Sequence, residues 1–258
     1  MDGVVAFLID PANWQGTTGI PNRLLEHLVI SGLSIAVATL IAVPIGLYVG
    51  HTNRGAGLAI NLANIGRAIP SYAMMVIPLP LTLSPAPVLG YDPGFGLTFL
   101  PIFLAMTFLA IPPLLVATYA GLRSVDRDLI EAGRGMGLRE RQILARIELP
   151  LASSIIVGGF RTATLQVIAT ATIGAILSGG GLGRFIFDGL NQGLAGRSSI
   201  YAGAILVAGL AIGVDLVLAF VQRRLTPVAL RVARRHGTSG PTSVVGGPDL
   251  TATRGEPA

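Results

Sequence analysis

The stretch EAGRGMGLRERQILARIELP, residues 131–150, is the only long charged segment between residues 24 and 221. Together with its lead-in it carries six arginines and five acidic residues between residues 123 and 148. Long apolar runs flank it on both sides. Because charged side chains are costly in lipid, this segment must lie in water outside the membrane. We expect it to dock a partner protein there.

The composition is that of a membrane protein. Of the 258 residues, 52% are hydrophobic and only 12% are charged, which is about half the charged share of a soluble domain. The length suits one membrane domain and leaves no room for a second, catalytic domain. The net charge of +5 indicates membrane topology rather than nucleic-acid binding, because the arginines lie beside apolar runs.

Residue types that are missing from the chain exclude several kinds of chemistry. All 18 cationic side chains are arginine, and without lysine the chain cannot form a Walker A phosphate loop. The chain has no cysteine, and its three histidines are too scattered for a metal site. We therefore expect no cofactor and no enzyme activity in this chain, with any ATP hydrolysis on a partner chain.

Five apolar runs are long enough to cross a bilayer as helices. They predict an all-α membrane protein of about five transmembrane helices, at residues 28–50, 58–81, 99–122, 150–177 and 200–221. Three prolines, Pro70, Pro78 and Pro80, are expected to kink or end the second helix. Residues 178–199 are expected to form a glycine-rich loop with a tight turn at 179–183.

The distribution of arginine predicts the orientation of the chain. The loops at 50–57 and 121–149 and the C-terminal tail share thirteen arginines, whereas the opposite side holds three. The positive-inside rule therefore places the charged segment and the C-terminus in the cytoplasm and the N-terminus outside. We divide the chain into an extracytoplasmic or interfacial segment (1–22), a transmembrane domain (23–226) containing the charged loop (123–150), and a basic, then disordered tail (227–258).

The charged segment itself is expected to be a bent pair of helices. Asp126 and a second acid precede it, as acidic residues do in a first helical turn. Glycines at Gly133, Gly135 and Gly137 favour a break in the helix. We therefore expect a helix, a bend and a second helix from about Leu138. The composition alone equally allows an ordinary solvated loop with an amphipathic helix.

The spacing within residues 131–150 resembles the EAA loop of ABC importer permeases, whose pattern is E-A-A-x3-G-x9-I-x-L-P. The matching residues are Glu131, Ala132, Gly137, Ile147, Leu149 and Pro150. Gly133 departs from the pattern, because it stands where the family has a third small residue, alanine. The resemblance implies that the ATPase-coupling helix is formed by Glu131, Ala132, Gly133, Gly137 and Leu138.

The resemblance extends over roughly residues 24–227 to type I, MetI-like permeases for osmoprotectants. The stretches that carry it are RAIPSYA (67–73), GLRSVDRDLIEAGRGMG (121–137), GGFRTATLQVIATATIGAILSGGGLGRFIFDGL (158–190) and DLVLAFVQRRLTP (215–227). That family imports glycine betaine, carnitine, choline or proline-type solutes, so a compatible solute is the expected cargo. Three alternatives stay open: another small solute such as an amino acid, a channel or secondary transporter without an ATPase, and a membrane scaffold without transport.

The resemblance also implies a set of partners in the inner membrane of a bacterium. Two permeases, either two copies of this chain or the chain and a paralogue, would form the membrane domain. Cytoplasmic ABC ATPase subunits would dock on the bend between Glu131 and Gly137, and an extracytoplasmic binding protein would deliver the solute. Closure of the ATPases would then tilt the helices and give alternating access. Nucleic acid is not an expected partner.

Three charged residues inside the apolar runs need partners. Arg67, Arg161 and Asp215 are each expected roughly 12–17 Å from the cytoplasmic face, at about 1.5 Å per helical residue. Charges at this depth are costly unless they are paired or hydrated. We therefore expect Asp215 to pair with Arg161 or Arg67 in a structural role. The alternative is that each arginine reaches the membrane surface alone.

Tyr72 is the candidate for lining a solute path. Aromatic rings hold quaternary ammonium groups, and Tyr72 lies in the second apolar run beside Pro70. Ordinary packing is the alternative role for this ring. Because the one tryptophan and five tyrosines are spread along the chain, we expect selectivity to lie mainly in the separate binding protein.

Overall fold

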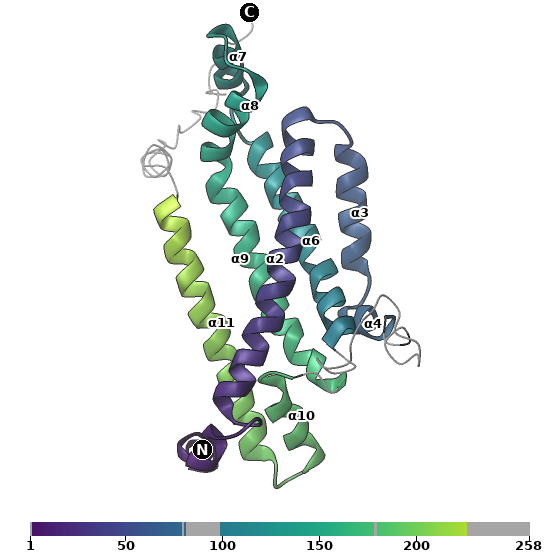
Figure 1. Cartoon of the computed structure of the whole chain (residues 1–258), viewed down its shortest axis with the longest axis vertical. Helices are drawn as coiled ribbons and strands as arrows, with labels where there is room; N and C mark the ends of the chain where they lie inside the picture. The colour runs from purple at the N-terminus through teal and green to yellow at the C-terminus, as the bar shows by residue number, and fades with distance from the viewer. Residues whose placement is uncertain (1, 79, 81–98, 178–179, 226–258) are drawn as a thin grey trace, which may run out of the picture. The chain divides into compact units, whose positions relative to one another are not determined.

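The computed structural model describes residues 2–78, 80, 99–177 and 180–225. The chain divides into two compact units, Met1–Thr226 and Pro227–Ala258, and the second unit lies outside the described residues. Residues 79 and 81 of the second predicted span and the predicted C-terminal tail (227–258) also fall outside them. The described part is built from helices, which Figure 1 shows in order along the chain.

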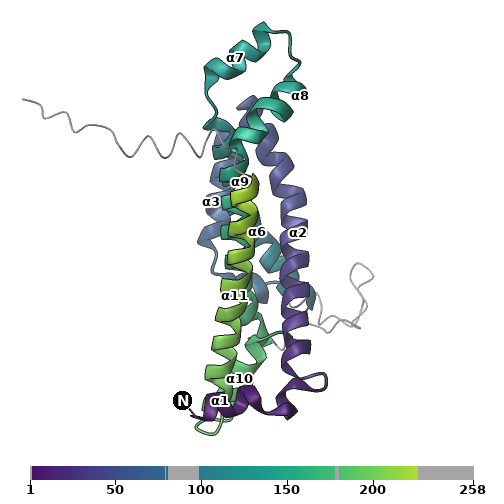
Figure 2. The ribbon, with the colours of Figure 1, turned by 90° about the vertical axis from the view of Figure 1, so that its left-hand side faces the viewer.

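Four helical stretches among the described residues are long and apolar enough to cross a membrane. They are α2 (Ile20–Thr52), α6 (Phe99–Arg123), the stretch Glu140–Leu177 whose main helix is α9 (Leu149–Gly174), and α11 (Arg197–Leu225). They run side by side in both views (Figures 1 and 2). They correspond to the first, third, fourth and fifth predicted spans, so the predicted all-α membrane architecture is confirmed.

The second predicted span is divided into two shorter helices, α3 (Ala56–Ala68) and α4 (Ser71–Val76). Between them Ile69 has extended backbone angles, and Pro70 is the N-cap of α4. Proline disfavours helical backbone in the residue before it and has no N–H for the helical ladder. The expected effect of Pro70 is therefore visible as a full break rather than a kink.

The core of the bundle lies between α2, α6 and α9, where small residues let the helices approach closely. Ala42 of α2, Ala110 of α6 and Ala163 of α9 are fully buried there. Gly159 of α9 faces Ala117 of α6, and a Cβ on Gly159 would overlap the Ala117 methyl group. Packing by small side chains is how membrane helices associate when lipid supplies no hydrophobic driving force.

Short helical segments lie at both ends of the bundle (Figure 2). At the N-terminal end are α1 (Asp2–Ile9), the 3-10 turn Pro11–Trp14, the 3-10 turn Ala175–Leu177 and α10 (Gly183–Asn191). At the opposite end are α7 (Arg127–Gly135), α8 (Glu140–Ile143) and the π-helical turn Leu144–Glu148 that leads into α9. Where only a glycine-rich loop was expected, at 178–199, α10 forms because Phe185 and Ile186 pack on Gly203 of α11.

Candidate functional site

Residues 124–148, here named the polar loop, form a small folded unit at one end of the bundle (Figure 2). Helices as short as α7 and α8 are marginal on their own in water, so tertiary contacts must stabilise them. The loop supplies these contacts with a small apolar core. Its buried members are Val125, Ile130 and Ile143, with Leu138, Ile147 and Leu151 packed against them.

The start of α7 is capped by its own sequence. The carboxylate of Asp126 accepts a hydrogen bond of 3.0 Å from the Asp128 N–H. Such a cap satisfies a backbone donor that the first turn of a helix leaves without a partner. The expectation that acidic residues mark the start of this helix is therefore confirmed.

The end of α7 is fixed by Gly137. This residue has φ +79°, its N–H donates to Arg134 O at 2.9 Å, and the Leu138 N–H donates to Gly133 O at 3.1 Å. This pair of bonds is the Schellman pattern, which needs a left-handed residue and therefore favours glycine. The bend thus lies at Gly137 alone, and the second helix begins at Glu140, two residues after the predicted start.

Gly133 is buried within α7 rather than breaking it. A Cβ on this residue would lie 2.8 Å from Cδ1 of Ile147 and 3.5 Å from Cδ1 of Leu138. The glycine that departs from the EAA pattern therefore lets the Ile147 side chain pack directly on α7. Glu131 and Ala132, in contrast, are exposed to solvent.

An ion pair joins the end of α7 to the start of α8. Arg134 donates from Nε and Nη2 to the two carboxylate oxygens of Glu140, at 2.8 and 3.1 Å. These hydrogen bonds hold the pKa of Glu140 below its ordinary value and raise the pKa of Arg134. Both side chains are at least half exposed, so the pair orients the two helices more than it stabilises them.

His51 connects the polar loop to α2, and the sequence did not predict this role. Its Nδ1 lies 2.5 Å from Oε2 of Glu148, and its Nε2 lies 3.3 Å from Oε2 of Glu140. The Glu148 side chain is only 4% exposed. The sequence contained one indication of this contact, because Glu148 lies next to an apolar span, where an acidic side chain needs a partner. It did not indicate which residue the partner is, because His51 is 97 residues away in the chain.

Inside the spans, the structure brings together two of the three predicted charges. Arg161 of α9 donates from Nε and Nη2 to the two carboxylate oxygens of Asp215 of α11. Nearer the polar loop, Gln222 Nε2 donates to Ser154 O at 2.9 Å, so polar contacts tie α11 to α9 at two levels. Arg67 lies in α3, and its side chain is outside the described residues.

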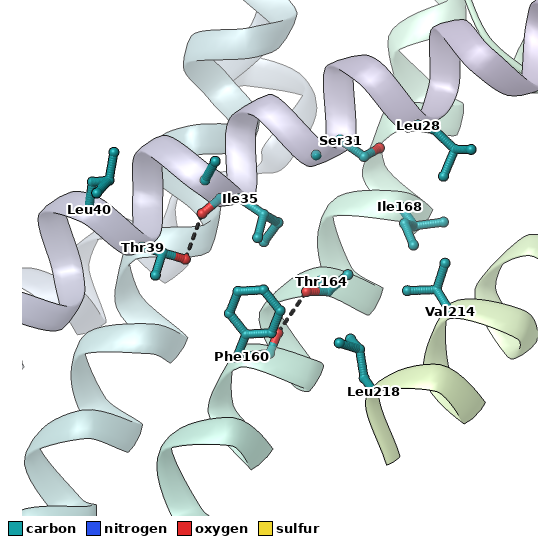
Figure 3. A pocket seen from close by; sticks show the side chains of 12 residues that line it. Leu28, Ser31, Ile35, Thr39, Leu40, Phe160, Thr164, Ile168, Val214 and Leu218 are labelled. Carbon is teal, nitrogen blue, oxygen red and sulfur yellow. Dashed lines mark hydrogen bonds between the residues drawn. The ribbon is translucent and has the colours of Figure 1, made fainter. Parts of the chain in front are cut away.

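A groove of about 510 Å³ lies between α2, α9 and α11 (Figure 3). Its lining is mostly apolar and includes Phe160 and Leu218. The hydroxyl groups of Thr39 and Thr164, which also line it, donate to carbonyl oxygens of their own helices. Tyr72 does not line this groove; it lies on α4, where it is 46% exposed.

The chain matches known proteins over most of its length. Residues 42–227 match the family described as binding-protein-dependent transport system inner membrane components. The chain belongs to this family. It is therefore a multi-pass membrane protein and the permease component of an ABC importer, as the EAA spacing predicted.

Named relatives and a solved structure agree with this assignment. The choline transport system permease protein OpuBB of Bacillus subtilis (strain 168) is 36% identical over 81% of this chain and 89% of that protein. The carnitine transport permease protein OpuCB of Listeria monocytogenes is 35% identical over 92% of this chain and all of that protein. The inward-facing MetNI methionine ABC transporter superposes with a TM-score of 0.66, at 22% identity, over 84% of this chain and 99% of that chain. This last likeness concerns the fold alone, and it confirms the predicted MetI-like architecture.

Proposed function

We propose that this permease imports compatible solutes of the glycine betaine, choline and carnitine class, driven by a separate ABC ATPase that docks on the polar loop. Support for the cargo comes from the relatives named for choline and carnitine transport, which are similar over most of both chains. Tyr72, exposed on α4, stays the candidate ring for contact with a quaternary ammonium group. The chain itself hydrolyses no ATP.

The exposed face of α7 is the observation that supports docking of an ATPase on this permease. Leu129 and Met136 are 49% and 75% exposed, and with Ala132 they share one side of the helix at spacings of three and four. The neighbouring side of α7 supplies Ile130 to the loop core. An exposed apolar stripe on a folded helix fits a groove on a partner protein.

The EAA residues then divide into two roles. Glu131 and Ala132 are exposed on α7 and are proposed to contact the ATPase. Gly133, Gly137 and Leu138 are proposed to hold the bend, since they form the packing and the backbone hydrogen bonds that end α7. Displacement of the bend by the ATPase would pass into α9, which follows the polar loop directly.

The remaining partners follow from the proposed orientation. The arginine distribution places the polar loop and the C-terminal tail (227–258) in the cytoplasm and the N-terminal segment (1–22) outside. The end of the bundle with α1 and α10 would then meet the solute-binding protein. A second permease, either another copy of this chain or a paralogue, would complete the membrane domain.

Charge substitution on α7 tests the docking proposal. Met136→Glu is expected to abolish co-purification of the ATPase, because a carboxylate in an apolar interface loses its hydration without gaining a partner. Leu194→Glu is the matched control: Leu194 is 76% exposed but lies in the turn between α10 and α11, at the other end of the bundle. Equal recovery of the ATPase with both variants would contradict the proposal.

A further inference from the structure

The ring of His51 can satisfy two carboxylates at once. One ring nitrogen faces Glu148 and the other faces Glu140. Carboxylates accept hydrogen bonds, so the form of histidine that serves both is the imidazolium, which has an N–H on each nitrogen. The ring and Glu148 are largely shielded from water, with side chains 14% and 4% exposed, which strengthens such a contact.

Through Glu140 the same contact reaches α7. Glu140 accepts two hydrogen bonds from Arg134 near the end of α7 while one of its oxygens faces His51. The end of α2, the start of α8 and the end of α7 are thus joined by three side chains. The contact between His51 and Glu148 also joins the π-helical turn that leads into α9 to the end of α2.

His51 provides a link that the backbone does not, because α2 is not covalently adjacent to the polar loop. The loop continues directly from α6 and into α9, so any movement of the loop acts on those two helices through the backbone. Among the described residues, the hydrogen bonds and ion pairs between α2 and the loop all involve His51. The neighbouring Gly50 packs closely on Leu122 of α6, which holds the ring in reach of the loop.

We propose that His51 is a positioning residue that carries displacement of α7 and α8 into α2. This inference rests on the proposed docking of an ATPase on α7. Since α2 forms one wall of the groove between α2, α9 and α11 (Figure 3), a shift of its His51 end changes that groove along with the tilt of α9. His51 thereby links ATP-driven movement of the polar loop to solute transport without contacting the ATPase or the solute.

The test compares ATP hydrolysis with solute uptake in the complete transporter. The chain is reconstituted in proteoliposomes with its ATPase and binding protein, and labelled glycine betaine is the probe. His51→Leu is expected to keep ATPase co-purification and hydrolysis while uptake per ATP falls about tenfold, the effect of losing roughly one charge-assisted hydrogen bond. His51→Gln, whose amide keeps N–H donors for Glu148 and Glu140 but carries no charge, is expected to lose less uptake per ATP than His51→Leu.

Two further variants make the outcome decisive. Thr52→Ala, at the exposed neighbour of His51, is the matched control and is expected to transport normally. His51→Leu combined with Glu148→Gln removes the buried charge that could otherwise impair folding, and it is expected to lose coupling as the single variant does. Unchanged uptake per ATP in the double variant would overturn the inference, and so would loss of ATPase binding, because His51 would then only hold the docking face. A failure of the proposed function, in contrast, would already appear in the unsubstituted protein.

Discussion

At the scale of single residues, Gly137 sets the shape of the polar loop through its backbone. It has φ +79°, and no atom lies within 4 Å of a Cβ built on it. Gly137→Ala is therefore expected to cost about 1 kcal/mol through backbone strain alone. Because the strain falls on the bend that presents α7, we expect weaker binding of the ATPase, measured as a higher Kd for the purified subunit.

Gly135→Ala is the control for this prediction. Gly135 has equally open surroundings, but it lies within α7, where alanine is preferred to glycine by about 1 kcal/mol. This variant should bind the ATPase as well as the unsubstituted permease or better. If both alanine variants bound equally, the left-handed bend would play no part in docking.

Individual contacts were predictable where the sequence restricts the possible partners. Asp215 is a lone acid among apolar residues, so its partner had to be one of few intramembrane arginines, and the structure selects Arg161. His51 was not predictable in this way, because five acidic residues of the charged segment were equally available to it. Only the folded position of the π-helical turn, which brings Glu148 next to His51, selects this acid.

At the scale of elements, α6 and α9 depend on close approach of their backbones at Gly159. Gly159→Ala is expected to destabilise the permease by about 1–3 kcal/mol, the usual cost of overpacking, because the new methyl group overlaps Ala117. The measurement is thermal unfolding of the purified protein in detergent. Gly158→Ala is the neighbouring control, since its Cβ would meet only the end of the Gln222 side chain, at 3.4 Å. Equal melting temperatures for the two variants would contradict this packing.

The elements were predictable where one local force determines them. Long apolar runs predicted the spans, and Pro70 predicted the interruption between α3 and α4. Helix α10 was missed because glycines at both of its ends suggested a loop, whereas packing of its apolar side on α11 decides its structure. Tertiary contacts of this kind override local propensity, and one sequence does not display them.

At the scale of the whole molecule, the proposed docking region and the groove lie at different positions along the bundle. The polar loop, with the Arg134–Glu140 pair and the exposed stripe of α7, lies at one end of the bundle (Figure 2). The groove and the Arg161–Asp215 pair lie among the apolar spans. In the proposed function, the ATPase displaces the polar loop, and the helices around the groove move in response. His51 and the direct continuation of the loop into α9 are two of the connections between them.

ATP-driven import is tested most directly by the accumulation of solute in the reconstituted transporter. The permease is placed in proteoliposomes with its ATPase and binding protein, and labelled glycine betaine, choline and carnitine are offered outside. At least one of them is expected to accumulate against its gradient, and only when ATP is supplied on the side of the ATPase. Equilibration without ATP, as in a channel, or accumulation driven by an ion gradient alone, as in a secondary transporter, would contradict it.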